Sequence, residues 1–517
     1  MEQDFRRSMG WLHTWAGVVL GSILFAVFWM GTLSVFDSEI DSWMEPATRL
    51  PTASSPLPLE TFRPSLNDAI AAKAAFWNVT MPDDRQAVVH VHYRTRQKFI
   101  TREFNPVTGK ELPNSGTLGA TGFIFPFHYT LEIGLMNLGE WLVGLASMAM
   151  LALCITGVII HRKLFAEFFT FRPTKKPRRM LLDLHNMAGV LGLPFHIILT
   201  FSGLVILSTT YFPGSVKAVY PNPRGYFFEV NGLTFLPIKP GKPGASVASL
   251  DKAASYVRNV WNEAEPHTIL VMNPGTTTSR MAFFRQSDRQ VTVDRDVISF
   301  ESPTGKYFSR SPAPHPIIRA EHFLSGVHLI QFHHWALRWF YFILGLGSCV
   351  LIGTGFLFWL AARRKTQEST FGFRIVEGVA SGSVTGIIIA TLVFFVANRL
   401  LFPNAHIFSQ DRSTLEIWAF YFSWLATFLH GWIRPRRMWI EQSATIGVLA
   451  ALAALLNWIT TGDHPLRTLF HRYLWPVAGM DAVLMIGSVL ALVVAQRLSR
   501  RARLSVLLSV PLRKRLE

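Results

Sequence analysis

Histidines recur at matching places in the two halves of the chain. The segment Leu12-His13-Thr-Trp-Ala-Gly17 corresponds to Leu184-His185-Asn-Met-Ala-Gly189, and His128 corresponds to His328 in the same order along the chain. A neutral imidazole binds metal ions, including haem iron, and exchanges protons near neutral pH. Two matched pairs of histidines therefore predict a site with one of these chemistries.

The four histidines stand at the ends of long apolar segments. If the two halves are related by a pseudo-two-fold axis along the membrane normal, His13 faces His185 and His128 faces His328. Two imidazoles that face each other across a helix bundle are what a bis-histidine haem iron requires. Gly17 and Gly189, one helical turn beyond, would leave room for a porphyrin face.

We therefore predict two haems, with iron bound by these four histidines. Covalent haem attachment is excluded, because no C-x-x-C-H is present. The alternative is that the histidines bind lipid headgroups and that the glycines pack helices. Zinc is disfavoured because carboxylate and cysteine partners are missing from these helix ends.

Four further histidines are weaker ligand candidates. His161 could replace a cytoplasmic ligand, and His333 or His334 could replace His328. His196 lies eleven residues past His185, roughly 16 Å deeper along a helix, and has no partner histidine at its own depth. Five others are interpreted as surface residues of external modules: His90, His92, His267, His315 and His322. No role is assigned to His406, His430, His464 and His471.

Neither the two cysteines nor any nucleotide-binding motif provides a redox site within the sequence. Cys154 and Cys349 lie in apolar segments, where packing is the expected role. No G-x-G-x-x-G follows a strand, and no P-loop is present. We therefore expect electrons to come from a membrane quinol or a separate cytoplasmic reductase.

The composition excludes an ordinary soluble enzyme. Half of the 517 residues are hydrophobic and 16% are charged, whereas a soluble domain is about 25% charged. Seven uncharged stretches, and an eighth that is interrupted by Asp481, approach the ~20 residues that a membrane-spanning helix needs. They are 8–36, 141–161, 184–216, 339–362, 378–398, 417–433, 442–462 and, more weakly, 473–496. The first is too long for a signal peptide and is interpreted as an anchor.

Basic residues set the predicted orientation. The net charge of +17 is concentrated before the first span, in the loop 162–183, after the spans that end at residues 362 and 433, and in the tail 497–517. All of these lie on the cytoplasmic side if both termini are cytoplasmic. The charge is thus interpreted as a topology signal, not as a nucleic-acid-binding surface.

This topology places the segments 37–127 and 217–327 outside the membrane, on the side opposite the cytoplasm. Each has an Ala-rich helical stretch, 66–77 and 250–261, and then alternating strands with a Pro-(x)-Thr-Gly-Lys turn, at 104–112 and 300–308. We predict a polytopic α-helical membrane protein with a duplicated four-helix core and two small α+β modules. The predicted parts are span 1–36, module 37–127, span 128–163, cytoplasmic loop 164–183, span 184–216, module 217–327, span 328–362, four further spans over 376–496, and the tail 497–517.

The duplicated Leu-His-x-x-x-Gly segments, the two Thr-Gly-Lys turns and the spans beginning near His128 and His328 resemble the PepSY-associated transmembrane proteins. Within that family the chain resembles the inner-membrane ferric-siderophore reductases of Gram-negative bacteria, over about residues 8–365. The resemblance implies PepSY-like modules, a b-type dihaem core and the four histidines above as ligands. It does not cover the C-terminal spans.

The resemblance also implies an oxidoreductase that reduces Fe(III) in a ferric siderophore, of hydroxamate type, at the periplasmic face. Phe127, Tyr129 and Arg319 are plausible contacts for this substrate near the external haem. The rival hypotheses are a haem reductase with a cupric or quinone substrate, a haem-free iron-siderophore transporter, and a regulatory protein. Haem content separates the reductases from the other two classes.

Overall fold

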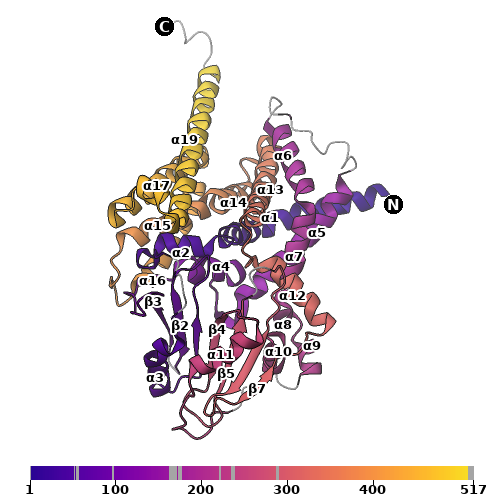
Figure 1. Ribbon diagram of the computed structural model, residues 1–517. Helices are drawn as coiled ribbons and strands as arrows, with labels where there is room; N and C mark the ends of the chain where they lie inside the picture. The colour runs from indigo at the N-terminus through magenta and orange to yellow at the C-terminus, as the bar shows by residue number, and fades with distance from the viewer. Residues whose placement is uncertain are drawn as a thin grey trace. The chain divides into compact units, whose positions relative to one another are not determined.

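The computed structural model describes residues 2–51, 53, 57–95, 98–161, 172, 177–220, 223–234, 239–286 and 290–509 (Figure 1). The chain forms two compact units. The helical unit comprises Met1–Pro46, Gly116–Phe201 and Trp339–Glu517, and the sheet unit comprises Ala47–Ser115 and Ser202–Arg338. Of the predicted cytoplasmic basic residues, Arg162, Lys163, Lys175, Lys176, Arg513, Lys514 and Arg515 lie outside the described residues.

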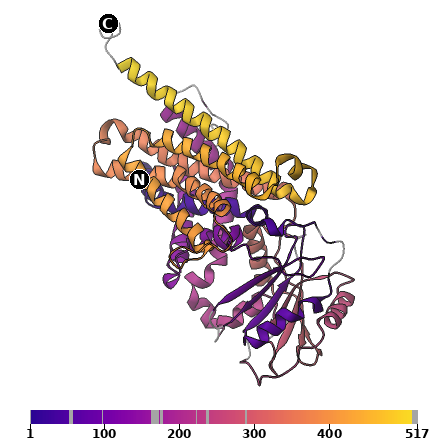
Figure 2. The same ribbon diagram turned by 90° about the vertical axis from the view of Figure 1, so that its left-hand side faces the viewer.

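Long apolar helices lie side by side in the helical unit (Figure 2). Its core consists of aromatic and aliphatic side chains from α1, α2, α15, α16, α17 and α19. The helices of this unit, including two that continue into the other unit, are α1 (Glu2–Ser34), α2 (Asp37–Met44), α4 (Phe125–Thr130), α5 (Leu138–Ile160), α6 (Pro177–Leu191), α7 (Leu193–Ile206), α13 (Trp335–Gln367), α14 (Phe371–Ser381), α15 (Ile387–Leu400), α16 (Arg412–Ile433), α17 (Met438–Thr461), α18 (Pro465–Phe470) and α19 (Trp475–Ser509).

Among the described residues, six helices are long and apolar enough to cross a membrane. They are Gln3–Ser34, Leu135–Ile160, Trp335–Gln367, Phe371–Leu400, Met438–Thr461 and Arg472–Arg503. The pair α6 and α7, bent by 61° at the break between them, is apolar enough to count as a seventh candidate if the two helices form one span. The protein is therefore a multi-pass helical membrane protein.

Seven of the eight predicted spans correspond to these segments, and the span predicted at 417–433 does not. That stretch lies in α16, which is helical but too polar to qualify by composition. The Arg412 and Glu416 side chains of α16 are buried and form an ion pair at 2.9 Å, and Tyr421 and Trp424 pack against the apolar core of the helical unit.

The strands of both predicted modules join in one antiparallel sheet of seven, in the order β3-β2-β1-β4-β5-β6-β7. The junction is β1 paired with β4, where Trp77 lies opposite Val271. The strands are β1 (Phe76–Thr80), β2 (Val89–Arg94), β3 (Phe99–Phe104), β4 (Pro266–Met272), β5 (Arg280–Arg285), β6 (Val297–Glu301) and β7 (Tyr307–Arg310). The α+β content of each module is as predicted, but the shared sheet was not foreseen.

One face of this sheet is covered by α3 (Arg63–Ala71) and α11 (Leu250–Val260), which correspond to the two Ala-rich stretches (Figure 1). Leu66 and Leu250 pack with Trp77 and Trp261 in a single apolar core. The remaining helices of the sheet unit are α8 (Ser208–Tyr211), α9 (Pro213–Val219), α10 (Pro223–Val230) and α12 (Pro316–Leu329).

The two Thr-Gly-Lys segments form the turns that the sequence predicts. Gly109 and Gly305 have φ of 66° and 70°, a backbone conformation that glycine adopts without strain. In each turn a backbone N–H reaches across to the carbonyl of the lysine: Asn105 to Lys110 and Glu301 to Lys306, both at 2.9 Å. The duplication is therefore present in the backbone as well as in the sequence.

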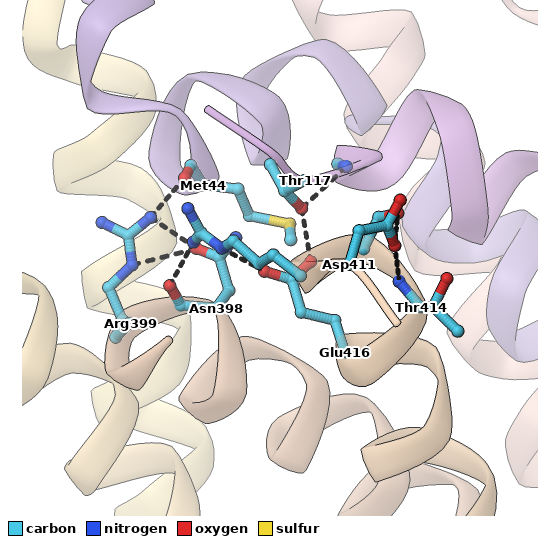
Figure 3. A network of polar contacts seen from close by, with 10 residues as sticks. Met44, Thr117, Asn398, Arg399, Asp411, Thr414 and Glu416 are labelled. Carbon is cyan, nitrogen blue, oxygen red and sulfur yellow. Dashed lines mark hydrogen bonds and ion pairs between the residues drawn. The ribbon is translucent and has the colours of Figure 1, made fainter. Parts of the chain in front are cut away.

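Residues 37–46 and 116–127, predicted to belong to the first module, fold with the helical unit instead. A network of hydrogen bonds and ion pairs connects both of these segments to the C-terminal helices (Figure 3). Glu416 is fully buried and accepts hydrogen bonds from Arg412 (2.9 Å), Asn398 (3.1 Å) and the Thr117 hydroxyl (2.5 Å). Buried charges are stable only when they are paired in this way.

Arg399 extends this network to α2. It donates to the Met44 carbonyl and to Asn398, and its guanidinium lies 4.9 Å from the centre of the Trp43 ring. Met44 and Thr117 thus flank the segment 47–115, which belongs to the sheet unit. The C-terminal helices, which supply Arg399 and Glu416, therefore fix both points at which this segment leaves and re-enters the helical unit.

Candidate functional site

His13 on α1 and His185 on α6 face each other within the helical unit. Their ring centroids are 6.3 Å apart, and the ring planes are nearly perpendicular, at 87°. Each histidine comes from one copy of the duplicated Leu-His-x-x-x-Gly segment, so the internal symmetry of the sequence brings the two together as predicted. The two rings are therefore neighbours across the contact between α1 and α6.

The hydrogen bonds of the two rings determine which nitrogen is available. His13 Nδ1 lies 3.0 Å from Thr156 Oγ1, and that hydroxyl donates to the Ala152 carbonyl at 2.7 Å. Nδ1 of His13 is therefore the donor to Thr156. His185 Nδ1 donates to the Leu351 carbonyl at 2.9 Å. Both Nε2 atoms then carry a lone pair, and neither forms a hydrogen bond within the described part of the chain.

Glycines make room for these rings. A Cβ atom on Gly157 would lie 3.4 Å from His13 Cε1, and one on Gly355 would lie 3.3 Å from His185 Cε1. Gly17 and Gly189, the glycines predicted to leave room, approach leucine side chains instead, at 3.9 and 3.3 Å. A repeated Thr-Gly pair, 156–157 and 354–355, is visible in the sequence. It marks Thr156 and the two ring-contacting glycines, which sequence reasoning did not assign to the site.

His128 has the same kind of surroundings. It lies on α4, its Nδ1 donates to the Val27 carbonyl at 2.8 Å, and a Cβ atom on Gly31 would lie 2.6 Å from its Cε1. The ring therefore lies directly on the glycine of a neighbouring helix.

His328 repeats this arrangement in the sheet unit. It lies on α12, its Nδ1 is 3.1 Å from Ser202 Oγ, and a Cβ atom on Gly203 would lie 2.8 Å from its Cε1. Gly31 and Gly203 have the same sequence separation as His13 and His185, namely 172 residues (203 − 31 and 185 − 13). Because His128 and His328 belong to different units, their mutual pairing stays a prediction.

The donor set at His13 and His185 fits a haem iron. A metal–imidazole bond is about 2.0 Å long, and a ring nitrogen lies about 1.1 Å from its ring centre, so two imidazoles on one iron have centres about 6 Å apart. The measured separation is 6.3 Å. A ligand histidine usually donates its other N–H to a hydroxyl, carbonyl or carboxylate, which fixes the tautomer, and both rings do so.

The weaker ligand candidates have other surroundings. His161 ends α5, where its backbone N–H binds the Gly157 carbonyl. His333 lies in the sheet unit with Nε2 3.3 Å from Asp84 Oδ2, and His334 is exposed. His196 is buried and binds Ser348.

Several predicted surface positions differ in the structure. Phe127, predicted as a substrate contact, is 1% exposed and packs in the apolar core, whereas Tyr129 is half-buried and Arg319 is exposed. His322, predicted to be a surface residue, is 4% exposed. Its Nδ1 atom lies 2.7 Å from Asp294 Oδ1, and its Nε2 atom lies 2.8 Å from the Val230 carbonyl oxygen.

His90 is also less exposed than predicted, with 18% of its side chain accessible. Burial lowers its pKa to about 4, and the neighbouring His92 imidazole acts in the same direction. The two rings are stacked in parallel on β2, 6.0 Å apart. These histidines belong to the face of the sheet opposite α3 and α11, because the alternate residues of β2 point into the apolar core.

Comparisons with known proteins match a large part of this chain. The sequence model of the family described as the PepSY-associated TM region matches residues 10–362, which include all four predicted ligand histidines. The uncharacterized protein PA4219 of Pseudomonas aeruginosa is 26% identical over 377 residues, which cover 67% of this chain and 89% of that protein.

Proposed function

Since the chain belongs to the PepSY-associated TM family, we propose that it is a dihaem b-type reductase of the bacterial inner membrane. It passes electrons across the membrane and reduces Fe(III) in ferric siderophores at the periplasmic face, with both termini in the cytoplasm. The observation that carries the proposal is the pair of facing imidazoles, His13 and His185, with both Nδ1 atoms engaged as donors.

Each residue of the candidate site has a role in the proposed function. His13 and His185 would hold one haem, and His128 and His328 are the proposed ligands of the other. The Thr156 hydroxyl and the Leu351 carbonyl fix the ring orientation and the tautomer, which raises the basicity of each Nε2. Gly157 and Gly355 let the rings lie close to the neighbouring helix. Haem bound in this way supplies reversible one-electron transfer, with a potential set by the axial ligands and by burial.

The chemistry of iron explains why reduction would release the metal from the proposed substrate. Hydroxamate and similar siderophores bind Fe(III) through hard oxygen donors. One added electron produces Fe(II), a softer and more labile ion that such ligands hold less tightly, so the metal is released. The electron donor is a quinol or a separate cytoplasmic reductase, because no dinucleotide-binding motif is present in the sequence.

An absorption spectrum of the detergent-purified protein, before and after dithionite, tests the haem assignment. We expect bis-histidine b-type spectra and close to two haems per chain. His13→Ala and His185→Ala should each remove the same haem, and His128→Ala and His328→Ala should each remove the other. A colourless, folded preparation from haem-replete cells would overturn the proposal.

The substrate is tested separately on the dithionite-reduced protein. Addition of a ferric hydroxamate siderophore should reoxidise the haems and release Fe(II), which a ferrous chelator traps. The iron-free siderophore is the control and should leave the spectrum reduced. If cupric ions or quinones reoxidise the haems and ferric siderophores do not, the haem assignment stands and the substrate assignment is wrong.

A further inference from the structure

His196 differs from the four predicted ligands in the nitrogen that it uses. It lies on α7, is 1% exposed, and its Nε2 is 2.9 Å from Ser348 Oγ. The Ser348 hydroxyl donates its own hydrogen to the Leu344 carbonyl at 3.0 Å. Ser348 therefore accepts from His196, so Nε2 carries the hydrogen and Nδ1 carries the lone pair. In His13 and His185 the roles are reversed.

The Nδ1 lone pair of His196 is buried and accepts no hydrogen bond from the described residues. Within the described residues, His196 Nδ1 forms no hydrogen bond, and neither does Oγ1 of Thr200, one helical turn further along α7. The ring is enclosed by Phe28 of α1 and by Phe195, at centroid distances of 6.2 and 6.0 Å. A Cβ atom on Gly192, at the bend between α6 and α7, would lie 2.5 Å from the ring. Buried polar atoms are normally paired, so an acceptor left in this state needs an explanation.

The first repeat shows that the fold itself does not require this histidine. With the same offset of 172 residues that relates His13 to His185, His196 corresponds to Leu24 (196 − 172). With the offset of 198 that relates Gly157 to Gly355, Ser348 corresponds to Met150 (348 − 198). Leu24 and Met150 are both buried in one apolar cluster. Two polar groups thus replace an apolar pair in only one of the two repeats.

The surroundings contain few other ionisable groups. The helix segments around the ring are 16–34 of α1, 193–206 of α7 and 339–362 of α13, and besides His196 their ionisable side chains are Tyr341 and Cys349. Tyr341 contacts Phe195, with ring centroids 5.6 Å apart, and Cys349 follows Ser348 in the sequence. Along the chain, His196 lies between His185 and Gly203. An ionisable residue at such a depth in a membrane helix is a functional candidate by default.

We propose that His196 binds a proton when the haem held by His13 and His185 is reduced. An electron that enters a low-dielectric interior is stabilised by a nearby positive charge. The Nδ1 lone pair can accept that charge while Nε2–H keeps its bond to Ser348. The balance is one electron, from the quinol or reductase, taken up by the haem and one proton, from water, taken up by Nδ1. The inference rests on the proposed haem function.

The test is a redox titration of the full-length purified protein at several pH values. A one-electron centre coupled to one proton changes its midpoint potential by up to about 59 mV per pH unit. We expect the potential of one haem to fall with rising pH. His196→Gln, which keeps a donor for Ser348 but does not titrate, should remove most of this slope. Tyr341→Phe is the matched control and should retain it.

A double variant and an infrared measurement distinguish loss of the proton-binding group from a general structural effect of the substitution. The double variant His196→Leu with Ser348→Met installs the pair of the first repeat, which the fold accommodates, and should also remove the slope with unchanged haem content. Infrared difference spectra between reduced and oxidised protein should show imidazole bands that His196→Gln abolishes. A slope that persists in both variants overturns the inference while the haem assignment stands. A protein without haem overturns both, and the absorption spectrum alone reveals it.

Discussion

The tautomer of each histidine determines the chemistry open to it. His13 and His185 use Nδ1 as a donor and present Nε2, whereas His196 uses Nε2 and leaves Nδ1 with a lone pair. A histidine ligand that presents Nε2 to a metal keeps its orientation only while the hydrogen-bond acceptor of its Nδ1–H is present. The residues that hold these rings are therefore as informative as the histidines themselves.

Thr156→Val tests the hydrogen-bond partner of His13. Valine has nearly the shape of threonine but cannot accept the hydrogen of Nδ1, so the ring loses its fixed orientation. Loss of such a partner typically weakens metal binding by about 10–100-fold. Haem release to apomyoglobin measures the change. Thr460→Val is the control, because Thr460 bonds only to its own helix, at the Leu456 carbonyl.

Gly355→Val tests the space beneath His185. A Cβ atom at this position already lies 3.3 Å from the ring, and the two additional methyl groups would displace the imidazole. We expect the haem content to fall from about two to about one per chain, as measured by pyridine haemochrome absorbance. Gly347→Val on the same helix is the control, since nothing lies within 4 Å of a Cβ atom there. Equal haem loss in both variants would contradict the assigned role of Gly355.

At the level of elements, the shared sheet contains a pH-sensitive position in β2. Burial holds the pKa of His90 at about 4, below its ordinary value of 6.5. Above pH 6.5 the ring is neutral in the folded and the unfolded chain. As the pH falls from 6.5 towards 4, only the unfolded chain gains the proton, so the sheet unit loses stability, by roughly 3 kcal/mol once the pH is below 4.

His90→Gln should therefore reduce the acid sensitivity of the sheet unit. Thermal unfolding followed by tryptophan fluorescence between pH 7 and 4 measures the effect, because Trp77 and Trp261 are buried in the core of this unit. His315→Gln is the control at an exposed histidine. If both variants follow the wild-type pH dependence, the acid sensitivity comes from other groups.

The polar network around Glu416 is an element-level contact between α15, α16 and the chain that leads into the sheet unit. Glu416→Gln removes the negative charge that lies 2.9 Å from the buried Arg412 guanidinium. Breaking a buried ion pair from one side costs about 3–5 kcal/mol. We expect a lower melting temperature in detergent and faster protease cleavage near residues 47 and 115.

Glu368→Gln is the matched control for this prediction. Its ion pair with Arg364 is 3.7 Å long and its side chain is 56% exposed, and such a pair contributes at most about 1 kcal/mol. Similar melting temperatures for Glu416→Gln and Glu368→Gln would show that the network does not stabilise the helical unit.

At the level of the whole molecule, basic residues predict the side on which each unit lies. Cysteines introduced at Thr108 and Ser255, both in the sheet unit, should react with a membrane-impermeant maleimide in intact cells. A cysteine at Ser369, between α13 and α14, should react only after lysis. Cys154 and Cys349 are buried, so background labelling is low. The opposite pattern would invert the topology.

The local sequence patterns determined much of this architecture. Apolar stretches identify seven candidate crossing segments, and the repeated Leu-His-x-x-x-Gly and Thr-Gly-Lys segments identify the duplication. They could be predicted because a helix of ~20 apolar residues and a turn with a glycine at positive φ depend on neighbours in the chain. The symmetry of the repeats was enough to pair His13 with His185.

Contacts between distant segments decided the rest. The pairing of β1 with β4, the burial of His322, and the contacts of Gly157 and Gly355 with the rings of His13 and His185 all join residues far apart in the chain. The tautomer of His196 depends on Ser348, which is 152 residues away. No local pattern encodes these choices, because hydrogen-bond partners and packing neighbours become defined only when the helices and strands have come together.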